Sequence, residues 1–384
     1  MFSSISVIIP VYNGQKFIGD ALESALRQSV APEEIIVVDD GSTDSTAEVV
    51  ESMRQSEPTI RLIRQPNAGQ PVARNRGVNS AHGKFLLMLD ADDRLLPNHI
   101  EVLHSAARKS GVAFSDYQVI DINSKVQEAH HRLRAAEVRL PNVLAYNYFP
   151  IGGSMITRDL WEKIGGLDEK LIGVEDWDWI TRALLAGYKP AHVPLPLWQY
   201  RFHAQNTSRN PHRMVQSNLA RLDKAFGEMN LPIKYHRYRA FSYLVNHALA
   251  AGQFLSIGNE TEALYHLQQA HLKAPHLFYS LQLFISYLKM YALNGGHDLA
   301  EKGVAAVLLA TEIAEEEQEK TRLHALGLMS LGLLLAKRPA QALPYLSTVI
   351  TKHPTVFLEV GNYRTLAHYT RMYATEMARR LYVG

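Results

Sequence analysis

Three carboxylates stand together where an apolar run ends. Asp90, Asp92 and Asp93 follow residues 85–89 directly. In extended geometry positions i and i+2 project to the same side, so we expect Asp90 and Asp92 to converge while Asp93 points away. Two converging carboxylates repel unless a cation joins them, and such oxygen ligands suit Mn²⁺ or Mg²⁺, which often also bind substrate phosphates. A solvated acidic turn is the alternative.

Two earlier segments carry charged side chains that could meet a ligand. Asp39 and Asp40 follow the apolar run 34–38, and a carboxylate there could accept a hydrogen bond from a ligand N–H, such as that of a base ring. It could equally only favour the dipole of the helix that follows. Arg74, in the segment 73–77, could pair with phosphate oxygens or belong to a solvated helix face.

A later block combines acids, aromatic rings and a basic pair. Asp176 lies beside Glu175 and tryptophans at the expected start of a helix, where limited solvation would raise its pKa and suit it to act as a general base. The alternative is an N-terminal helix acid with the tryptophans in the core. Arg201 and His203 follow the apolar run 191–198, so Arg201 could pair with a diphosphate and His203 could supply a third metal ligand.

The elements that must position these side chains alternate along the first ninety residues. The apolar runs 6–9, 34–38, 60–63 and 85–89 predict strands, and the segments between them have helical periodicity. This alternation predicts a doubly wound α/β sheet with parallel pairing. Ligands of such sheets bind beyond the carboxyl ends of the strands, where the acids cluster. The segment after the first strand has no G-x-G-x-x-G, and no P-loop motif occurs, which disfavours dinucleotide dehydrogenases and P-loop NTPases.

Five motifs, in order, resemble those of a family 2 glycosyltransferase with the GT-A fold. They are residues 7–13, V-I-I-P-V-Y-N; 38–44, V-D-D-G-S-T-D; 73–77, A-R-N-R-G; 89–93, L-D-A-D-D; and the pair 175–176, E-D, with the later Y-R-x-H of 200–203. The resemblance covers about residues 1–210, and we expect these to form the GT-A (Rossmann-like), mostly parallel α/β catalytic domain.

The resemblance implies a role for each matching residue. Asp176 corresponds to the catalytic base of an inverting enzyme. Asp90 and Asp92 correspond to the D-x-D metal motif, and we add His203 as a further ligand. The residues expected around the nucleotide, with Asp40 meeting a uracil ring, are Pro10, Tyr12, Asp39, Asp40, Arg74 and Arg201.

The strand pattern disappears beyond residue 210, and residues 211–384 predict an all-α C-terminal domain. Residues 262–275 and 341–354 repeat an Ala-Leu pair followed by a proline, 79 positions apart. This layout resembles tetratricopeptide repeats weakly, and an irregular helical bundle is the alternative. Such helices could dock a protein partner.

Composition sets the remaining bounds. The net charge of +2 gives no whole-chain case for a nucleic-acid partner, and the absence of cysteine excludes thiolate catalysis. We expect no signal peptide and no transmembrane segment, because the most apolar window, 323–336, falls short of the roughly 20 residues that span a bilayer. A cytoplasmic location, or a peripheral one at the inner face of the membrane, follows.

We therefore expect an enzyme that moves a sugar from a nucleotide-sugar donor, with a lean to UDP, to a hydroxyl of a glycan or lipid-linked acceptor. Two alternatives stay open. A sugar nucleotidyltransferase would normally carry a Gly-rich basic loop after its first strand, which residues 10–14 do not supply. A helical-repeat scaffold with a degenerate enzyme domain would not need the acids at 90, 92 and 176.

Overall fold

The structure is a computed structural model, and it describes residues 4–133, 135–203, 206 and 210–273. The chain divides into two compact units, Met1–Tyr238 and Arg239–Gly384. We describe each unit by itself. The expected boundary at residue 210 stays a prediction, and helices α7 and α8 belong to the first unit.

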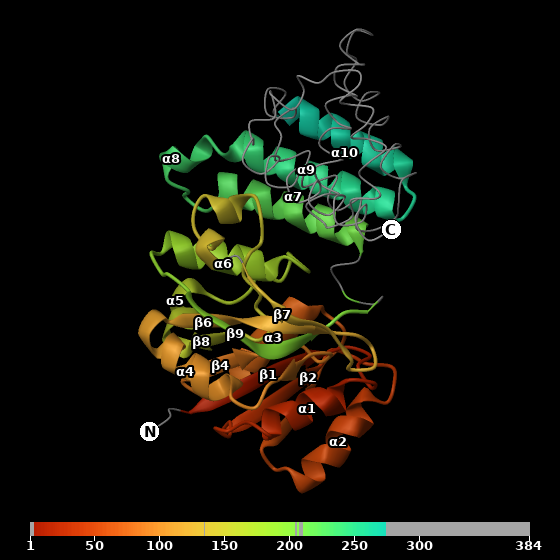
Figure 1. Cartoon of the computed structure of the whole chain (residues 1–384), viewed down its shortest axis with the longest axis vertical. Helices are drawn as coiled ribbons and strands as arrows, with labels where there is room; N and C mark the ends of the chain where they lie inside the picture. Colours follow the sequence, from red (N-terminus) through yellow and green to blue (C-terminus); the bar gives the residue numbers. More distant parts are fainter. Residues whose placement is uncertain (1–3, 134, 204–205, 207–209, 274–384) are drawn as a thin grey trace, which may run out of the picture. The chain divides into compact units, whose positions relative to one another are not determined.

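The described part of the first unit contains nine strands (Figure 1). Their bounds are β1 Ile5–Val11, β2 Glu34–Asp39, β3 Ile60–Arg64, β4 Phe85–Met88, β5 Arg94–Leu95, β6 Val112–Ile120, β7 Val126–His131, β8 Met155–Thr157 and β9 Ala191–Arg201.

Helices separate most of these strands. In the first unit they are α1 Ile18–Leu26, α2 Thr46–Ser56, α3 Gln70–Ser80, α4 His99–Ser110, α5 Arg158–Ile164, α6 Glu175–Leu185, α7 Pro211–Gly227 and α8 Ile233–His236, with short 3-10 turns η1 Ala135–Glu137 and η2 Asn142–Leu144.

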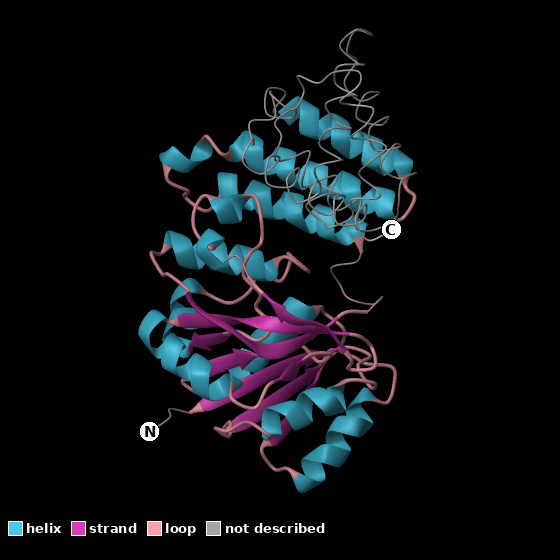
Figure 2. Cartoon of the chain, viewed as in Figure 1, coloured by secondary structure: helices cyan, strands magenta, loops and turns pink. Residues whose placement is uncertain are grey.

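All nine strands form one sheet, with the order β3-β2-β1-β4-β8-β6-β9-β5 and β7 paired to β6 (Figure 2). The pairings among β3, β2, β1 and β4 are parallel, as predicted from the alternating pattern. The other half is mixed, because β8 runs antiparallel to both of its neighbours, β4 and β6, while β6 and β9 are parallel. The expectation of a mostly parallel sheet therefore holds for the first four strands but not for the whole sheet, and the fold is an α/β mixed sheet.

Alternate side chains of β1 enter two different cores. Val7 and Ile9 pack with α1, α2 and α4 on one face, whereas Ile8 packs with α3, α5 and α6 on the other. Every residue of β1 is buried. A strand covered on both faces explains the continuous apolar run at the start of the sequence.

The second unit is described only over the helices α9 Arg239–Ser256 and α10 Glu260–Lys273. Helix α10 confirms a helix at the first of the two Ala-Leu segments. The second segment, at 341–354, and the window 323–336 lie outside the described residues, so the repeat and the partner surface stay predictions. Within the described ranges, no helix has both the length and the apolar character needed to cross a bilayer.

Candidate active site

A cavity of about 1360 Å³ opens at the carboxyl ends of the parallel strands. Loops after β1, β2 and β4 line it, together with the N-terminal ends of α3 and α6 and the segment 150–152. The end of β9 and the first residues of α7 complete the lining. Because β2, β1 and β4 are neighbours in the sheet, loops distant in sequence meet at one edge.

Most of the residues singled out from the sequence line this cavity together. They are Pro10, Tyr12, Asp40, Arg74, Asp90, Asp92, Asp176 and His203. Tyr12 is half-exposed, as a ring available for stacking would be. Asp39 and Arg201 do not line it.

The acidic loop after β4 is a turn rather than an extended segment. The N–H of Asp93 donates to the carbonyl of Asp90 (3.1 Å), which brings positions i and i+3 together. Asp90 and Asp92 line the cavity, whereas Asp93 does not and is only 1% exposed. Burial and the neighbouring charges of Asp92 and Asp90 raise the pKa of the Asp93 carboxyl well above its ordinary value. Its Oδ2 is buried and has no hydrogen-bond partner among the described residues.

Asp92 and His203, which both line the cavity, contact each other. His203 Nε2 lies 2.8 Å from Asp92 Oδ2, and the His203 ring also packs against Phe17. Asp90 is held from another side, because its Oδ1 accepts from Gln70 Nε2 (3.2 Å) and from Arg74. In the described part of the chain, no three His, Asp or Glu side chains are already arranged to hold a metal ion. The expected third ligand, His203, lies beside Asp92.

Asp40 organises the loop that precedes α3. Its Oδ2 accepts from the N–H of Gly69 (2.8 Å), and its Oδ1 accepts from the N–H of Ala68 (2.9 Å) and from Gln65 Nε2 (2.7 Å). Gly69 has a φ of 97°, a left-handed conformation that favours glycine. The carboxylate is 3% exposed but borders the cavity.

Asp176 lies in the first turn of α6, next to Glu175. Burial and the charge of Glu175 raise the pKa of Asp176 to about 7, although a hydrogen bond from Asn147 opposes the shift. Asn147 Nδ2 donates to Asp176 Oδ2 (3.1 Å). The flanking rings of Trp177 and Trp179 are buried in the core.

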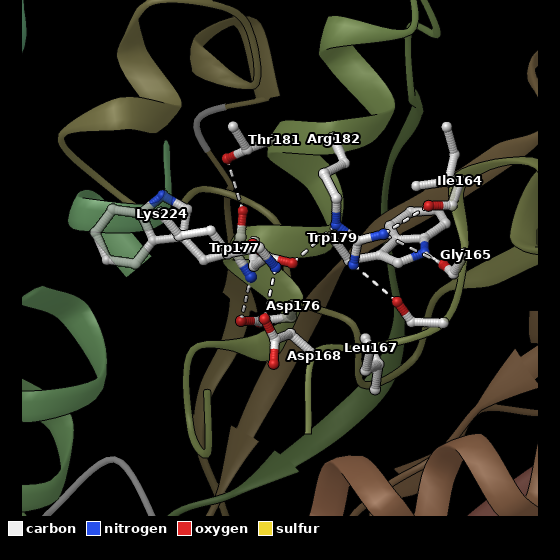
Figure 3. Close-up of polar contacts among 12 residues, drawn as sticks. Ile164, Gly165, Leu167, Asp168, Asp176, Trp177, Trp179, Thr181, Arg182 and Lys224 are labelled. Carbon is white, nitrogen blue, oxygen red and sulfur yellow. Dashed lines mark hydrogen bonds and ion pairs between the residues drawn. The ribbon is translucent and has the colours of Figure 1, made fainter. Parts of the chain in front are cut away.

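Helix α6 is fixed by a network of charges and carbonyl oxygens (Figure 3). Arg182 donates to the carbonyls of Ile164 (2.7 Å) and Gly166 (2.8 Å), and its Nε contacts Asp178 Oδ2 (2.8 Å). Lys224 of α7 lies 2.6 Å from Asp168 Oδ2 and 2.9 Å from Asp178 Oδ1. The orientation of the helix that carries Asp176 therefore depends on these contacts.

Asp39 supports the loop after β2 from within the sheet. Asp39 is fully buried and accepts from the N–H of Ser42 (2.9 Å) and from Arg64 Nε (3.1 Å). The Asp39 carboxylate therefore contacts the loop and does not present an exposed oxygen to the base ring of a nucleotide.

Arg201 lies behind the acidic turn, not in the cavity. Its backbone N–H donates to Asp93 Oδ1 (2.8 Å), its Nε donates to the carbonyl of Asp92 (2.7 Å), and its Nη2 contacts Asp20 (3.0 Å). Its side chain is 1% exposed. Arg201 is thus placed to hold the acidic turn, and a direct contact with a diphosphate is not what this geometry favours.

Some residues of the site carry no signal in the sequence. Asn147 lies between η2 and β8, and Gln70 stands among other polar residues, so neither spacing nor an adjacent motif marks them. Arg213, in the first turn of α7, lines the cavity from beyond the expected domain boundary. Only the juxtaposition of distant segments brings these side chains to the site.

Comparison with known proteins gives a consistent result. The family model described as Glycosyl transferase family 2 matches residues 6–165. The chain is similar to an uncharacterized glycosyltransferase, YibD, of Escherichia coli K12, with 28% identity over 56% of this chain and 66% of that protein. It is also 28% identical to the chondroitin synthase of Pasteurella multocida, over 53% of this chain but only 21% of that enzyme. The chain thus spans at most about two thirds of these relatives.

A solved structure shares the fold. The crystal structure of Staphylococcus aureus TarS residues 1–349 with UDP-GlcNAc has a TM-score of 0.56 at 16% identity, over 83% of this chain and 92% of that one. At this identity the likeness concerns the fold alone. It supports a GT-A-like arrangement for the sheet and helices of this chain.

Proposed function

The chain contains a family 2 glycosyltransferase domain, and from this premise we propose that it transfers a sugar from a UDP-sugar to a hydroxyl of a glycan or lipid-linked acceptor, with inversion at the anomeric carbon. One observation carries the proposal. Asp40, Asp92 and Asp176, which come from three separate motifs, border one cavity large enough for a nucleotide sugar.

The donor would lie along the carboxyl ends of β1, β2 and β4. Tyr12 offers an aromatic face to a base, and Pro10 lines the same end. Asp40 Oδ2 accepts one hydrogen bond from the chain, so it keeps capacity to accept another from a base N–H such as that of uracil. The TarS structure that shares the fold is a complex with UDP-GlcNAc, which supports a uridine nucleotide for this chain.

The residues of the acidic turn fit a divalent cation. Asp90 and Asp92 line the cavity, and behind them Asp93 Oδ2 is buried without a hydrogen-bond partner in the described residues. We propose that Asp92 and Asp90, with His203 beside Asp92, hold Mn²⁺ or Mg²⁺ when the donor binds. The ion would neutralise charge on the departing nucleoside diphosphate.

Asp176 would act as the general base. An acceptor oxygen attacks the anomeric carbon, the bond from that carbon to the diphosphate oxygen breaks, and the hydroxyl proton passes to Asp176. A pKa of about 7 keeps a large ionised fraction near neutral pH while leaving the carboxylate basic enough to take the proton. Attack from the face opposite the leaving group gives inversion.

The acceptor would enter from the side of α6 and the segment 150–152. Both line the cavity, and Arg213 of α7 adds a cation to the same lining. A related chain that is named as a chondroitin synthase, a glycan-forming enzyme, supports a glycan acceptor.

The full chain should be incubated with a panel of UDP-, GDP- and dTDP-sugars and Mn²⁺, and release of the nucleoside diphosphate should be measured. We expect slow, metal-dependent hydrolysis of one or more UDP-sugars and a thermal shift with UDP. Release of pyrophosphate from UTP and a sugar phosphate would instead indicate a nucleotidyltransferase. No binding to any nucleotide sugar would favour a degenerate enzyme domain.

A further inference from the structure

Arg74 is a buried bridge between carboxylates of two other segments. From α3, its Nη1 lies 2.6 Å from Glu175 Oε1, and its Nη2 contacts Asp90 Oδ1. Its side chain and that of Glu175 are each only 3% exposed. These partners are 16 and 101 residues away in the chain, so the bridge exists only in the folded molecule.

The Arg74 guanidinium is already engaged by carboxylates of the protein. Both of its terminal nitrogens already contact carboxylates, and its Nε is buried without a hydrogen-bond partner among the described residues. Arg74 lines the cavity, so a diphosphate bound there would compete with Asp90 and Glu175 for the same guanidinium. The direct contact with the nucleotide that the sequence motif suggested is therefore a poor fit to this geometry.

The bridge joins the two halves of the proposed site. Asp90 belongs to the acidic turn at the donor end, and Gln70, also from α3, donates to the same oxygen. Glu175 belongs to α6, immediately before Asp176, and its second oxygen accepts from the N–H of Gly173 (2.6 Å). The side chain of Arg74 thus fixes both the acidic turn that contains Asp90 and helix α6, which carries Asp176, relative to α3.

Charge makes this arrangement depend on Arg74. Glu175 is buried next to Asp176, and Asp90 lies close to two further acids of its turn. A buried carboxylate left without its cation destabilises the fold strongly, because its hydration is lost and nothing replaces it. Removing the guanidinium would leave the buried carboxylate of Glu175 without its cation, and the Asp90 carboxylate, which is 25% exposed, without its charged partner.

We propose that Arg74 is a positioning residue, which holds the donor-binding turn and the base-bearing helix in a single geometry and does not itself bind the diphosphate. The proposal rests on the proposed function for its catalytic consequence. The bridge itself can be tested without any enzymatic activity.

The first experiment is a double-mutant cycle on the full chain with Arg74→Met and Glu175→Gln. We expect Arg74→Met to lower the Tm by about 10 °C and the added Glu175→Gln to restore at least half of that loss, because the partner no longer carries an unpaired charge. The matched control is Arg54→Met with Glu51→Gln, an exposed arginine–glutamate pair at 2.6 Å, which should show almost no coupling. Additive Tm changes at Arg74 and Glu175 would overturn the bridge.

The second experiment separates positioning from binding. With saturating Mn²⁺, we expect Arg74→Met to lower kcat about 100-fold, the scale reported for small misplacements, while the Kd for UDP by calorimetry rises less than fivefold. A Kd that rises about 100-fold and is not recovered by Glu175→Gln would mean that Arg74 is a nucleotide ligand, and would overturn the proposal.

Two further outcomes have a defined meaning. If Arg74→Met does not fold, Glu175→Gln alone decides, because it should lower kcat at least tenfold with an unchanged Kd for UDP. An unchanged kcat in that variant would contradict the positioning role. If the wild type binds no UDP and turns over no nucleotide sugar, the proposed function fails, whereas the Tm cycle still tests the bridge.

Discussion

His203 Nε2 lies 2.8 Å from Asp92 Oδ2, although 111 residues separate the two in the chain. The contact joins the end of β9 to the acidic turn after β4. The backbone of Arg201, two residues before His203, holds the same turn through Asp93. The acidic turn is thus anchored by the last strand of the sheet, which gives His203 access to any cation that Asp92 binds.

Removing the Asp92 carboxylate should abolish metal-dependent nucleotide binding. We expect Asp92→Asn to raise the Kd for UDP in Mn²⁺ about 10- to 100-fold and to leave the Kd in EDTA unchanged, because only the cation-linked part of the affinity is lost. His203→Ala should have a smaller effect in the same direction. Calorimetry with and without Mn²⁺ measures both. Equal UDP affinity of the wild type in EDTA and in Mn²⁺ would contradict the metal site.

Replacing the expected base should separate catalysis from binding. We expect Asp176→Asn to lower kcat about 10²- to 10⁴-fold, the usual contribution of a positioned base, because an amide cannot take the acceptor proton. The Kd for UDP should stay within about twofold, since the proposed role of Asp176 is to take the acceptor proton and not to bind the nucleotide. Steady-state turnover and calorimetry of the same preparation give the two numbers. Unimpaired turnover would remove Asp176 from this role.

The same carboxylate should govern how stability depends on pH. The folded-state pKa of Asp176, about 7, lies above the ordinary value of an aspartate, so the folded state binds this proton more tightly than the unfolded state. The stability contributed by the group is therefore present at pH 4 and is lost as the pH rises through 7. We expect Asp176→Asn to raise the Tm by about 5 °C at pH 8 and hardly at all at pH 4. Equal shifts at both values would contradict the raised pKa.

Much of the site could be predicted because parallel strands place their carboxyl ends at one edge. The sequence predicts that the acids after the second and fourth strands lie at one ligand site. Asp40, Asp90 and Asp92 do line one cavity. The resemblance to family 2 glycosyltransferases is confirmed for the first part of the chain. These inferences needed only strand order and local motifs.

Other features depended on contacts that no local pattern encodes. The i+2 rule does not predict the burial of Asp93, because the loop is a turn rather than the extended segment on which the rule depends. The sequence predicts that Arg201 pairs with a diphosphate, but its side chain turns to the carbonyl of Asp92 and to Asp20. The three-residue strand β8 is too short to show a period, so the antiparallel part of the sheet could not be foreseen.

Asn147 should lower the pKa of Asp176, the proposed general base. Its Oδ1 accepts from the N–H of Phe149 (3.0 Å), which orients the amide so that Nδ2 donates to Asp176. That donation lowers the pKa of Asp176, so its loss should move the acidic limb of the pH–rate profile upward. We expect Asn147→Ala to shift this limb by about half to one unit. Asn142→Ala, whose side chain contacts Glu137 instead, is the control, and a profile as in the wild type for both variants would exclude the role.

Lys224 should link α7 to the catalytic helix, although it lies outside the segment that matches the family. Its ammonium pairs with Asp178, which is fully buried on α6, and with Asp168 (Figure 3). We expect Lys224→Met to destabilise the first unit by about 3 kcal/mol, because Asp178 keeps only Arg182 as a cation, and to lower the Tm by about 5–10 °C. Lys234→Met on the exposed helix α8 should change the Tm by less than about 1 °C.

The Lys224 substitution should also affect catalysis, because α6 carries Asp176. At temperatures well below the unfolding transition, we expect the kcat of the Lys224 variant to be lower than that of the wild type, whereas its affinity for UDP should be unchanged. A stable variant with wild-type kcat would show that α7 is dispensable for the site.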